Sequence, residues 1–308
     1  MSPLVSVILP TFNRLQYLPD AVASIFAQTF EDWELLIADD GSDAETKAYL
    51  QTLDDPPRVR LIHLPHTGRP AVVRNTALRQ ARGEYVAFMD SDDIWMPRKL
   101  MIQIASLRAH GDCGWSQTKF ILADAGRKTT REMPVVDGWI LGTLLNTDTV
   151  VALPSVVASR ALLDQVGGFD EDLVMCEDYD LWLRLSARSQ VDAVDEPLTI
   201  VRRHGEHYGN AATSFRDCIR VLDKVLRSGA AAQHASVVRK ERAKNSARLA
   251  RCYAAYGDRQ GALRTLLSTA PSSWRHPEWW FGALATTAAA FAPENVRKLV
   301  RKHKRRSN

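Results

Sequence analysis

The chain has 308 residues, of which 45% are hydrophobic and 25% charged, as is usual for a globular protein with a substantial core. Its four cysteines are far apart and form no CxxC pair, which argues against a zinc or disulfide framework and fits a reducing compartment. The first residues lack the features of a signal peptide. No apolar run reaches the length of about 18 residues that would suggest a membrane span.

The net charge of +4 is unevenly distributed along the chain. From Glu294 to the end there are seven basic residues and one acidic residue, so this tail carries +6 and residues 1–293 carry −2. The basic character of the sequence therefore belongs to the tail and says nothing about the partners of the main domain.

The first 90 residues alternate between strand and helix patterns. β-Branched and apolar runs predict strands at 4–9, 33–38, 59–64 and 84–89, and apolar residues at helical spacing predict helices at 15–28, 43–53 and 70–82. Pro70 in the first turn and Gly83 at the end suit the termini of the third helix. Apolar strands alternating with helices predict the α/β class, with a mostly parallel sheet covered by helices on both faces.

The middle of the chain mixes both patterns, and the last third is helical only. We expect strands at 113–122, 149–159 and 191–203, a short helix at 161–166 and an amphipathic helix at 176–189. Residues 246–271 resemble one tetratricopeptide helical pair, which cannot form a solenoid alone and predicts a local helical hairpin. We predict two domains, an α/β domain at 1–212 and a helical extension with a basic tail at 213–308.

Polar, turn-prone residues follow each of the four predicted parallel strands. In an open α/β sheet, ligands bind in the crevice beyond the carboxyl ends of the strands. The sequence therefore predicts one polar rim, contributed by Thr11 and Asn13, Asp39 to Ser42, His66 and Gly68, and Asp90 to Asp93.

Three carboxylates stand together in "DSDD" directly after the fourth strand. This segment could be a solvated turn in which one aspartate caps the next helix, near Pro97. Alternatively, it could bind a divalent cation together with a diphosphate, because Mg²⁺ commonly takes only one or two protein carboxylates and fills its shell with water and phosphate oxygens. The position at a strand end favours the cation.

Two further acidic motifs each allow two interpretations. "ADDGS" at 38–42 fits an Asp–Gly turn with Ser42 or Asp43 capping the next helix, yet a carboxylate there could also bind a ribose hydroxyl or a base N–H. "CEDYD" at 176–180 places acids at a helix N-terminus, which the helix dipole favours. One of these acids could instead be a general base that takes a proton from an acceptor hydroxyl.

Five segments together resemble the family 2 glycosyltransferases, which have the GT-A fold. In chain order they are "VSVILPTFNR", "QTFEDWELLIADDGS", "RNTALRQARGEYVAFMDSDDIWMPRKL", "VGGFDEDL" and "CEDYDLWLRL", between Val5 and His204. The resemblance implies an inverting transferase that uses a nucleotide-diphosphate sugar, most often UDP-linked, with Mg²⁺ or Mn²⁺. The QxxRW motif of processive synthases is absent from the sequence, so we expect the transfer of a single sugar.

The resemblance also implies roles for individual residues. Asp178 would be the catalytic base, with Glu177 beside it, and Asp92 would ligate the metal. His204 falls where some relatives have a further metal or phosphate ligand, although it could equally be a surface histidine. The residues expected to bind the nucleotide are Pro10, Thr11, Phe12, Asp39, Asp40, Arg74, Asn75 and Asp90.

The expected partners follow from this function. They are a nucleotide-diphosphate sugar donor and a sugar or lipid-linked acceptor, in cell-surface polysaccharide or glycolipid assembly. The aromatic residues 279–281 and the basic tail fit either a helix with a solvated end or a peripheral contact with the inner face of the cytoplasmic membrane. We expect a cytoplasmic protein and no nucleic-acid partner, because no recognised module is present.

Two other functions compete with this one. A nucleotidyltransferase on a similar sheet would need a Gly-rich, basic loop after the first strand, and "PTFNRLQ" is not such a loop. A non-catalytic sugar-nucleotide-binding or scaffold protein would tolerate the loss of Asp92 or Asp178, and the chain has both residues.

Overall fold

The computed structural model describes residues 2–53, 58–124, 130–146, 150–203, 211–229, 231–274 and 276–291. The chain forms two compact units, Met1–His204 and Gly205–Asn308, which are treated separately below. The boundary that the sequence predicts, between residues 212 and 213, lies within the first helix of the second unit, α8 (Ala211–Ser228).

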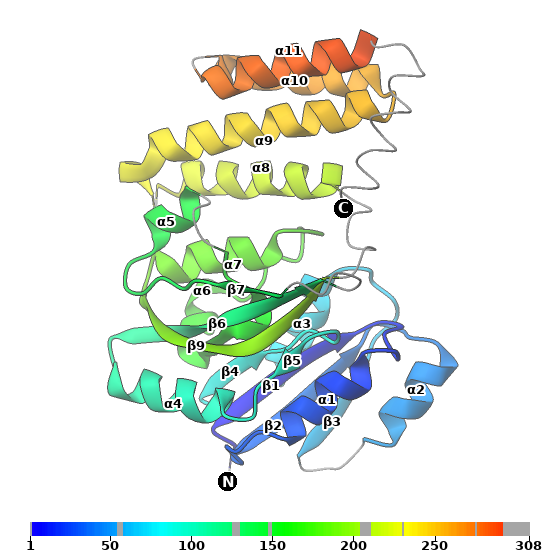
Figure 1. Cartoon of the computed structure of the whole chain (residues 1–308), viewed down its shortest axis with the longest axis vertical. Helices are drawn as coiled ribbons and strands as arrows, with labels where there is room; N and C mark the ends of the chain where they lie inside the picture. The colour runs from blue at the N-terminus through cyan, green and yellow to red at the C-terminus, as the bar shows by residue number, and fades with distance from the viewer. Residues whose placement is uncertain are drawn as a thin grey trace. The chain divides into compact units, whose positions relative to one another are not determined.

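One mixed sheet forms the centre of the first unit, with the strand order β3-β2-β1-β4-β8-β6-β9-β5 and with β7 beside β6 (Figure 1). Helices cover the sheet, and both β1 and β2 are buried along almost their whole length. The α/β class is therefore confirmed. The strands are β1 (Val5–Thr11), β2 (Trp33–Asp39), β3 (Val59–His63), β4 (Tyr85–Phe88), β5 (Ile94–Trp95), β6 (Cys113–Asp124), β7 (Thr130–Met133), β8 (Val156–Ser159) and β9 (Gln190–Arg203).

The first four strands are parallel, as the sequence predicts. Helices α1 (Leu18–Phe26), α2 (Ala44–Gln51) and α3 (Pro70–Leu78) connect them. In this register Thr11 pairs with Asp39, and Asp39 pairs with His63, so the ends of β1, β2 and β3 lie next to one another. The predicted polar rim is therefore present at the carboxyl end of the parallel strands.

Beyond β4 the sheet changes direction. β8 is antiparallel to both β4 and β6, whereas β6 and β9 run parallel to each other. The register between β6 and β9 shifts beside Pro197, where the missing N–H interrupts the ladder. Of the strand predicted at 149–159, only Val156–Ser159 forms, because Leu153–Ser155 make a 3₁₀ turn around Pro154.

Aromatic packing fixes the helix that follows the "GGFDEDL" segment. This helix is α7 (Glu177–Ser186), and it follows α6 (Arg160–Val166). Its Trp182 stacks on Trp115 of β6, with centroids 5.6 Å apart and an interplanar angle of 6°. Phe169 meets Phe88 of β4 edge to face at 5.3 Å. These contacts hold α7 against β6 and the segment before α7 against the end of β4.

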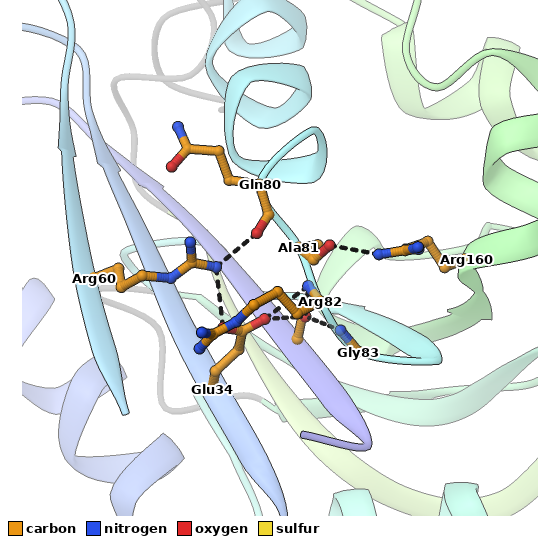
Figure 2. A network of polar contacts seen from close by, with 8 residues as sticks. Glu34, Arg60, Gln80, Ala81, Arg82, Gly83 and Arg160 are labelled. Atoms are coloured by element: carbon orange, nitrogen blue, oxygen red, sulfur yellow. Dashed lines mark hydrogen bonds and ion pairs between the residues drawn. The ribbon is translucent and has the colours of Figure 1, made fainter. Parts of the chain in front are cut away.

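A buried carboxylate, Glu34, binds several neighbours at the opposite end of the parallel strands (Figure 2). Glu34 accepts hydrogen bonds from the Ser6 hydroxyl at 2.7 Å and from the Arg82 backbone N–H at 2.8 Å, and it pairs with Arg60 at 3.0 Å. The loop between α3 and β4 passes close to β1, since a Cβ on Gly83 would lie 2.5 Å from the Ser6 nitrogen. Although burial alone raises the pKa of Glu34, the bonds from Ser6 and Arg82 outweigh burial and lower it.

The second unit contains α8, α9 (Ala235–Ala255), α10 (Arg259–Ser273) and α11 (Pro277–Phe291), and the other three helices pack on α9. Gly257 makes the turn between α9 and α10 with a φ of 87°, and Asp258 caps α10. The helical hairpin predicted at 246–271 is thus present. Among the described helices, none combines the length and the apolar character that a membrane span requires.

Candidate active site

The acidic segment after β4 turns back on itself, because the Asp93 N–H donates to the Asp90 carbonyl at 3.2 Å. Asp93 is buried, and its carboxylate accepts a hydrogen bond of 2.8 Å from the backbone N–H of Arg202 on β9. None of these aspartates caps the following helix, α4 (Lys99–Ala109), which begins without a side-chain cap. The solvated-turn interpretation, with an aspartate as helix cap, therefore does not explain the segment.

Burial and mutual repulsion raise the pKa values of two of these carboxyls. Burial raises the pKa of Asp90, and the charge of Asp92 adds to the effect against the opposing charge of Arg74. Burial likewise raises the pKa of Asp93 well above its ordinary value, with Asp90 and Asp92 as the next causes. Like charges are therefore crowded in this segment, which suits a cationic ligand.

Arg74 on α3 connects this segment with the start of α7. Its guanidinium donates to Asp90 at 2.8 Å and to Glu177 at 2.7 Å, and its side chain is only 9% exposed. Burial alone lowers the pKa of Arg74, but the charges of Asp90 and Glu177 outweigh burial and raise the pKa above its ordinary value, so the residue stays charged. A salt bridge with good geometry therefore joins residues that are far apart in the chain.

Asp178 lies at the beginning of α7, next to Glu177. The residue before the helix, Cys176, has a φ of 62°, which is a strained conformation for a residue with a side chain. The carboxylate of Asp178 accepts a hydrogen bond of 2.7 Å from the Tyr179 N–H. Burial, followed by the charge of Glu177, raises the pKa of Asp178 to about 7. A carboxyl with this pKa can exchange a proton near neutral pH.

Glu177 and Asp178 differ in their surroundings. Glu177 is paired with Arg74, so its charge is neutralised by a partner in hydrogen-bonding contact. The Tyr179 N–H and the charge of Arg74 both lower the pKa of Asp178, but burial and the charge of Glu177 outweigh them. Of the two acids, Asp178 is the better proton acceptor.

The aspartates that follow β2 are both buried and bind neighbouring loops. Asp40 accepts hydrogen bonds from the Thr67 N–H at 2.8 Å and from the Gly68 N–H at 2.9 Å. Asp39 accepts one of 3.0 Å from the Ser42 N–H. Asp43 caps α2, in agreement with one interpretation of this motif. Asp40 therefore shapes the loop after β3, a contact that sequence patterns did not indicate.

The end of β1 contributes an aromatic surface and a buried hydroxyl. Phe12, which follows Pro10 and Thr11, stacks on His66 with ring centroids 4.0 Å apart, and both rings are partly exposed. The Thr11 hydroxyl is buried and has no hydrogen-bond partner among the described residues. A flat aromatic pair with polar groups beside it can receive a planar base.

Asn75 does not share the partners of its neighbour Arg74. Its amide donates to the Phe169 carbonyl and to Glu171, both at 2.9 Å, and its oxygen accepts from the Phe169 N–H. A pocket of about 430 Å³ lies beside it, lined in part by Arg79 and Gly168. Asn75 therefore fixes the "GGFDEDL" loop, and its nucleotide role stays a prediction.

The candidate metal ligands are only partly described. Asp92 is close enough to Asp90 and Asp93 to raise both of their pKa values. His204 lies outside the described residues. Among the residues that the structure describes, no group of three or more His, Cys, Asp or Glu side chains is arranged as a metal site. The carboxylates present fit a cation that takes one or two protein ligands and completes its shell with phosphate oxygens and water.

Comparison with known proteins relates this arrangement to one family. Residues 6–147 match the family described as "Glycosyl transferase family 2". The Escherichia coli enzyme "UDP-Glc:alpha-D-GlcNAc-diphosphoundecaprenol beta-1,3-glucosyltransferase WfgD" is 30% identical over 62% of this chain and 73% of its own length. The chain spans about a third of the length of the first curated relatives it matches, which are uncharacterized glycosyltransferases of Rickettsia species.

Solved structures share the fold. The S. aureus protein TarS (residues 1–349, in complex with UDP-GlcNAc) superposes with a TM-score of 0.68 at 19% identity, over 89% of this chain and 82% of that one. The mannosyltransferase PcManGT of Pyrobaculum calidifontis, in complex with GDP-Man and Mn²⁺, gives 0.55 at 20% identity, over 94% and 85%. With a GT-A-like fold and a relative matched over most of its length, the chain belongs to glycosyltransferase family 2.

Proposed function

We propose that the chain transfers a single sugar, with inversion, from a nucleotide-diphosphate sugar to an acceptor hydroxyl. The observation that carries the proposal is the link Asp90–Arg74–Glu177, which ties the acidic segment after β4 to the helix that begins with Asp178. One substrate spanning these two elements would have its diphosphate near Asp90 and its reacting carbon near the Asp178 carboxylate.

The chemistry requires one proton acceptor and one leaving group. The acceptor oxygen forms a bond to the anomeric carbon while the bond from that carbon to the diphosphate oxygen breaks. The proton of the acceptor hydroxyl goes to Asp178, whose pKa of about 7 suits this transfer, and the nucleoside diphosphate leaves with the electron pair. Attack opposite the leaving group inverts the configuration at carbon.

A divalent cation, Mg²⁺ or Mn²⁺, is part of the proposal. When bound, it would neutralise the charge that develops on the diphosphate. Asp92 would hold it, and Asp90 would contact the ribose or a metal-bound water. The crowding of negative charge around Asp90, Asp92 and Asp93 supports this assignment, because a cation would offset it.

The end of β1 and the loops after β2 and β3 would bind the nucleoside. Phe12 with His66 offers a stacking surface, and the partnerless Thr11 hydroxyl offers a polar contact. We propose UDP as the nucleotide, since WfgD is named for UDP-Glc and the TarS complex contains UDP-GlcNAc. Asp40 would act here through the Thr67–Gly68 loop that it holds.

We place the acceptor beside the "GGFDEDL" loop, at the pocket next to Asn75 and Gly168. The name of WfgD supports a lipid-linked sugar as acceptor and a role in cell-surface polysaccharide or glycolipid assembly. The basic tail, residues 294–308, would then bring the protein to the inner face of the membrane. The tail lies outside the described residues, and its +6 charge is the support for this part.

A thermal-shift panel of nucleotide sugars, with and without Mn²⁺, tests the donor assignment. A ligand at 100 times its dissociation constant should add about 2.7 kcal/mol to the free energy of unfolding. We expect UDP-sugars to stabilise the protein more than GDP-sugars, and only with the metal present. Stabilisation by nucleoside triphosphates alone would instead favour the nucleotidyltransferase.

A further inference from the structure

The outer sides of α10 and α11 are apolar and exposed. In most surface helices the side opposite the core carries polar residues. Here that side carries leucine, tryptophan and phenylalanine, with more than half of each side chain accessible to solvent. We call these six residues the α10–α11 apolar face: Leu263, Leu267, Trp274, Trp280, Phe281 and Leu284.

The packing of α11 accounts for the helix without using this face. Trp279 and Thr286 are buried, and Gly282 lies so close to Ala247 of α9 that a side chain there would collide with it. These positions recur at three- and four-residue intervals, so they form the side of α11 that meets α9. The rings of Phe281 and Trp274 and the side chain of Leu284 therefore lie largely outside the side of α11 that packs on α9.

Hydrogen bonds join the two helices near the turn between them. Trp279 of α11 donates to the Thr269 hydroxyl of α10 at 3.2 Å. The ring of the neighbouring Trp280 donates to the Trp274 carbonyl at 2.6 Å. These bonds fix the end of α10 against the start of α11, and the apolar face runs across both helices. Apolar surfaces of this kind mark sites of interaction with proteins or membranes.

The charge of the second unit distinguishes between those partners. Residues 205–308 contain 20 lysines and arginines and seven acidic residues, a net charge of +13, whereas residues 1–204 carry −9. The +6 of residues 294–308 directly follows α11. Two copies of this basic unit would repel each other if their apolar faces met. An anionic lipid bilayer has an apolar interior and negatively charged headgroups, so it attracts both the apolar face and the positive charge of this unit.

We propose that the α10–α11 apolar face inserts into the interfacial region of an anionic lipid bilayer, to which the net positive charge of the second unit attracts the protein. Tryptophan and phenylalanine suit that depth, because their rings are favourable at the level of the headgroups. The proposal does not depend on transferase activity. It makes membrane contact a property of a folded helical surface as well as of the basic tail.

Vesicle flotation of the full-length chain tests the proposal. We expect it to float with vesicles of phosphatidylcholine that contain about 30 mol% phosphatidylglycerol, and to stay in solution with phosphatidylcholine alone. The variant Phe281→Ser/Leu284→Ser should bind the anionic vesicles about tenfold more weakly. The matched control is Trp139→Ser/Val150→Ser, which changes two exposed apolar residues of the first unit and should bind as the wild type does.

A second measurement does not depend on any variant. Brominated lipids quench tryptophans that enter the interface, so the fluorescence of the wild type should fall and shift to the blue with anionic vesicles. Absence of flotation and of quenching would overturn the proposal, as would equal binding by the two double variants. Concentration-dependent dimers in sedimentation velocity, lost in Phe281→Ser/Leu284→Ser, would assign the face to a second copy instead. Sugar transfer enters none of these readouts.

Discussion

Arg74 and Glu177 are joined by a hydrogen bond of 2.7 Å, although 103 positions separate them in the chain. The contact brings a helix of the parallel half of the sheet to the first turn of α7. It also pairs Glu177 with a cation, while burial and the charge of Glu177 raise the pKa of the adjacent Asp178 to about 7. The division of roles between these two adjacent acids follows from this contact.

Asp178→Asn should keep donor binding and lose transfer. Loss of a general base lowers the rate by about 10²–10⁴-fold, whereas an amide of the same shape leaves the surrounding packing intact. Calorimetry with a UDP-sugar and a product assay measure the two effects. Asp195→Asn, which changes an exposed aspartate of β9, is the control and should transfer normally. A fully active Asp178→Asn protein would refute the assignment.

The pH dependence of transfer should follow the ionisation of Asp178. A general base acts when deprotonated, so the rate should rise with pH through about 7. Glu177→Gln should move this rise to lower pH, because the charge of Glu177 is the second cause, after burial, of the raised pKa. Profiles of kcat/KM for both proteins measure the shift. A shift to higher pH would contradict the electrostatic argument.

Arg74→Ala should have the opposite effect on the same profile. The positive charge of Arg74 lowers the pKa of Asp178, so its removal should move the rise in rate to higher pH. It would also remove the Arg74 partner of the buried Glu177 and of the partly exposed Asp90, so we expect a loss of stability of about 3 kcal/mol. Arg108→Ala, which changes an exposed arginine of α4, is the control and should keep the wild-type profile. An unchanged profile in Arg74→Ala would separate the salt bridge from catalysis.

Removal of divalent metal should abolish transfer reversibly. We expect chelation to stop the reaction and Mn²⁺ or Mg²⁺ to restore it, with Asp92→Asn requiring a higher metal concentration for half-maximal rate. Titration of metal into the chelated wild type and variant checks this. Asp112→Asn, which changes an exposed aspartate at the start of β6, should titrate as the wild type does. Full activity in excess chelator would remove the cation from the proposal.

Glu34→Gln should destabilise the first unit without touching the site. The change weakens charge-assisted bonds from Ser6, Arg60 and Arg82, for a loss of about 2 kcal/mol at pH 7. Since the pKa of Glu34 is lowered on folding, its contribution is present above its unfolded value of about 4.5 and disappears as the pH falls below it. Urea unfolding at pH 7 and at a pH well below 4.5 measures the loss. Glu196→Gln, which changes an exposed glutamate, is the control.

The parallel half of the sheet was predictable because each of its elements carries its own local pattern. The strands that end at Thr11 and Asp39 are buried on both faces, the strand that ends at His63 is partly buried, and each is followed by turn residues. The short strand at Ile94–Trp95 was missed, because two residues cannot show a period and only pairing with β9 defines them. The strand predicted at 149–159 was too long, since a proline within an apolar run favours a turn.

The site was predictable in its membership but not in its contacts. Motifs named Arg74, Asp90, Glu177 and Asp178, yet no local pattern indicates that the first of these bridges the next two. The engagement of Asn75 with Phe169, and of Asp40 with Thr67, likewise depends on long-range folding. His66 was predicted to lie on the rim, but its stacking on Phe12 was not.

The change from parallel to antiparallel pairing at β4 and β8 has an evolutionary consequence. Everything proposed to hold the nucleoside precedes this seam, and the loop and helix proposed to meet the incoming hydroxyl follow it. Recombination can therefore replace the part of the chain after β4 and change the acceptor, while the nucleotide-sugar donor stays the same. Chimeras joined between residues 154 and 156 would be the natural place to look for such modular ancestry.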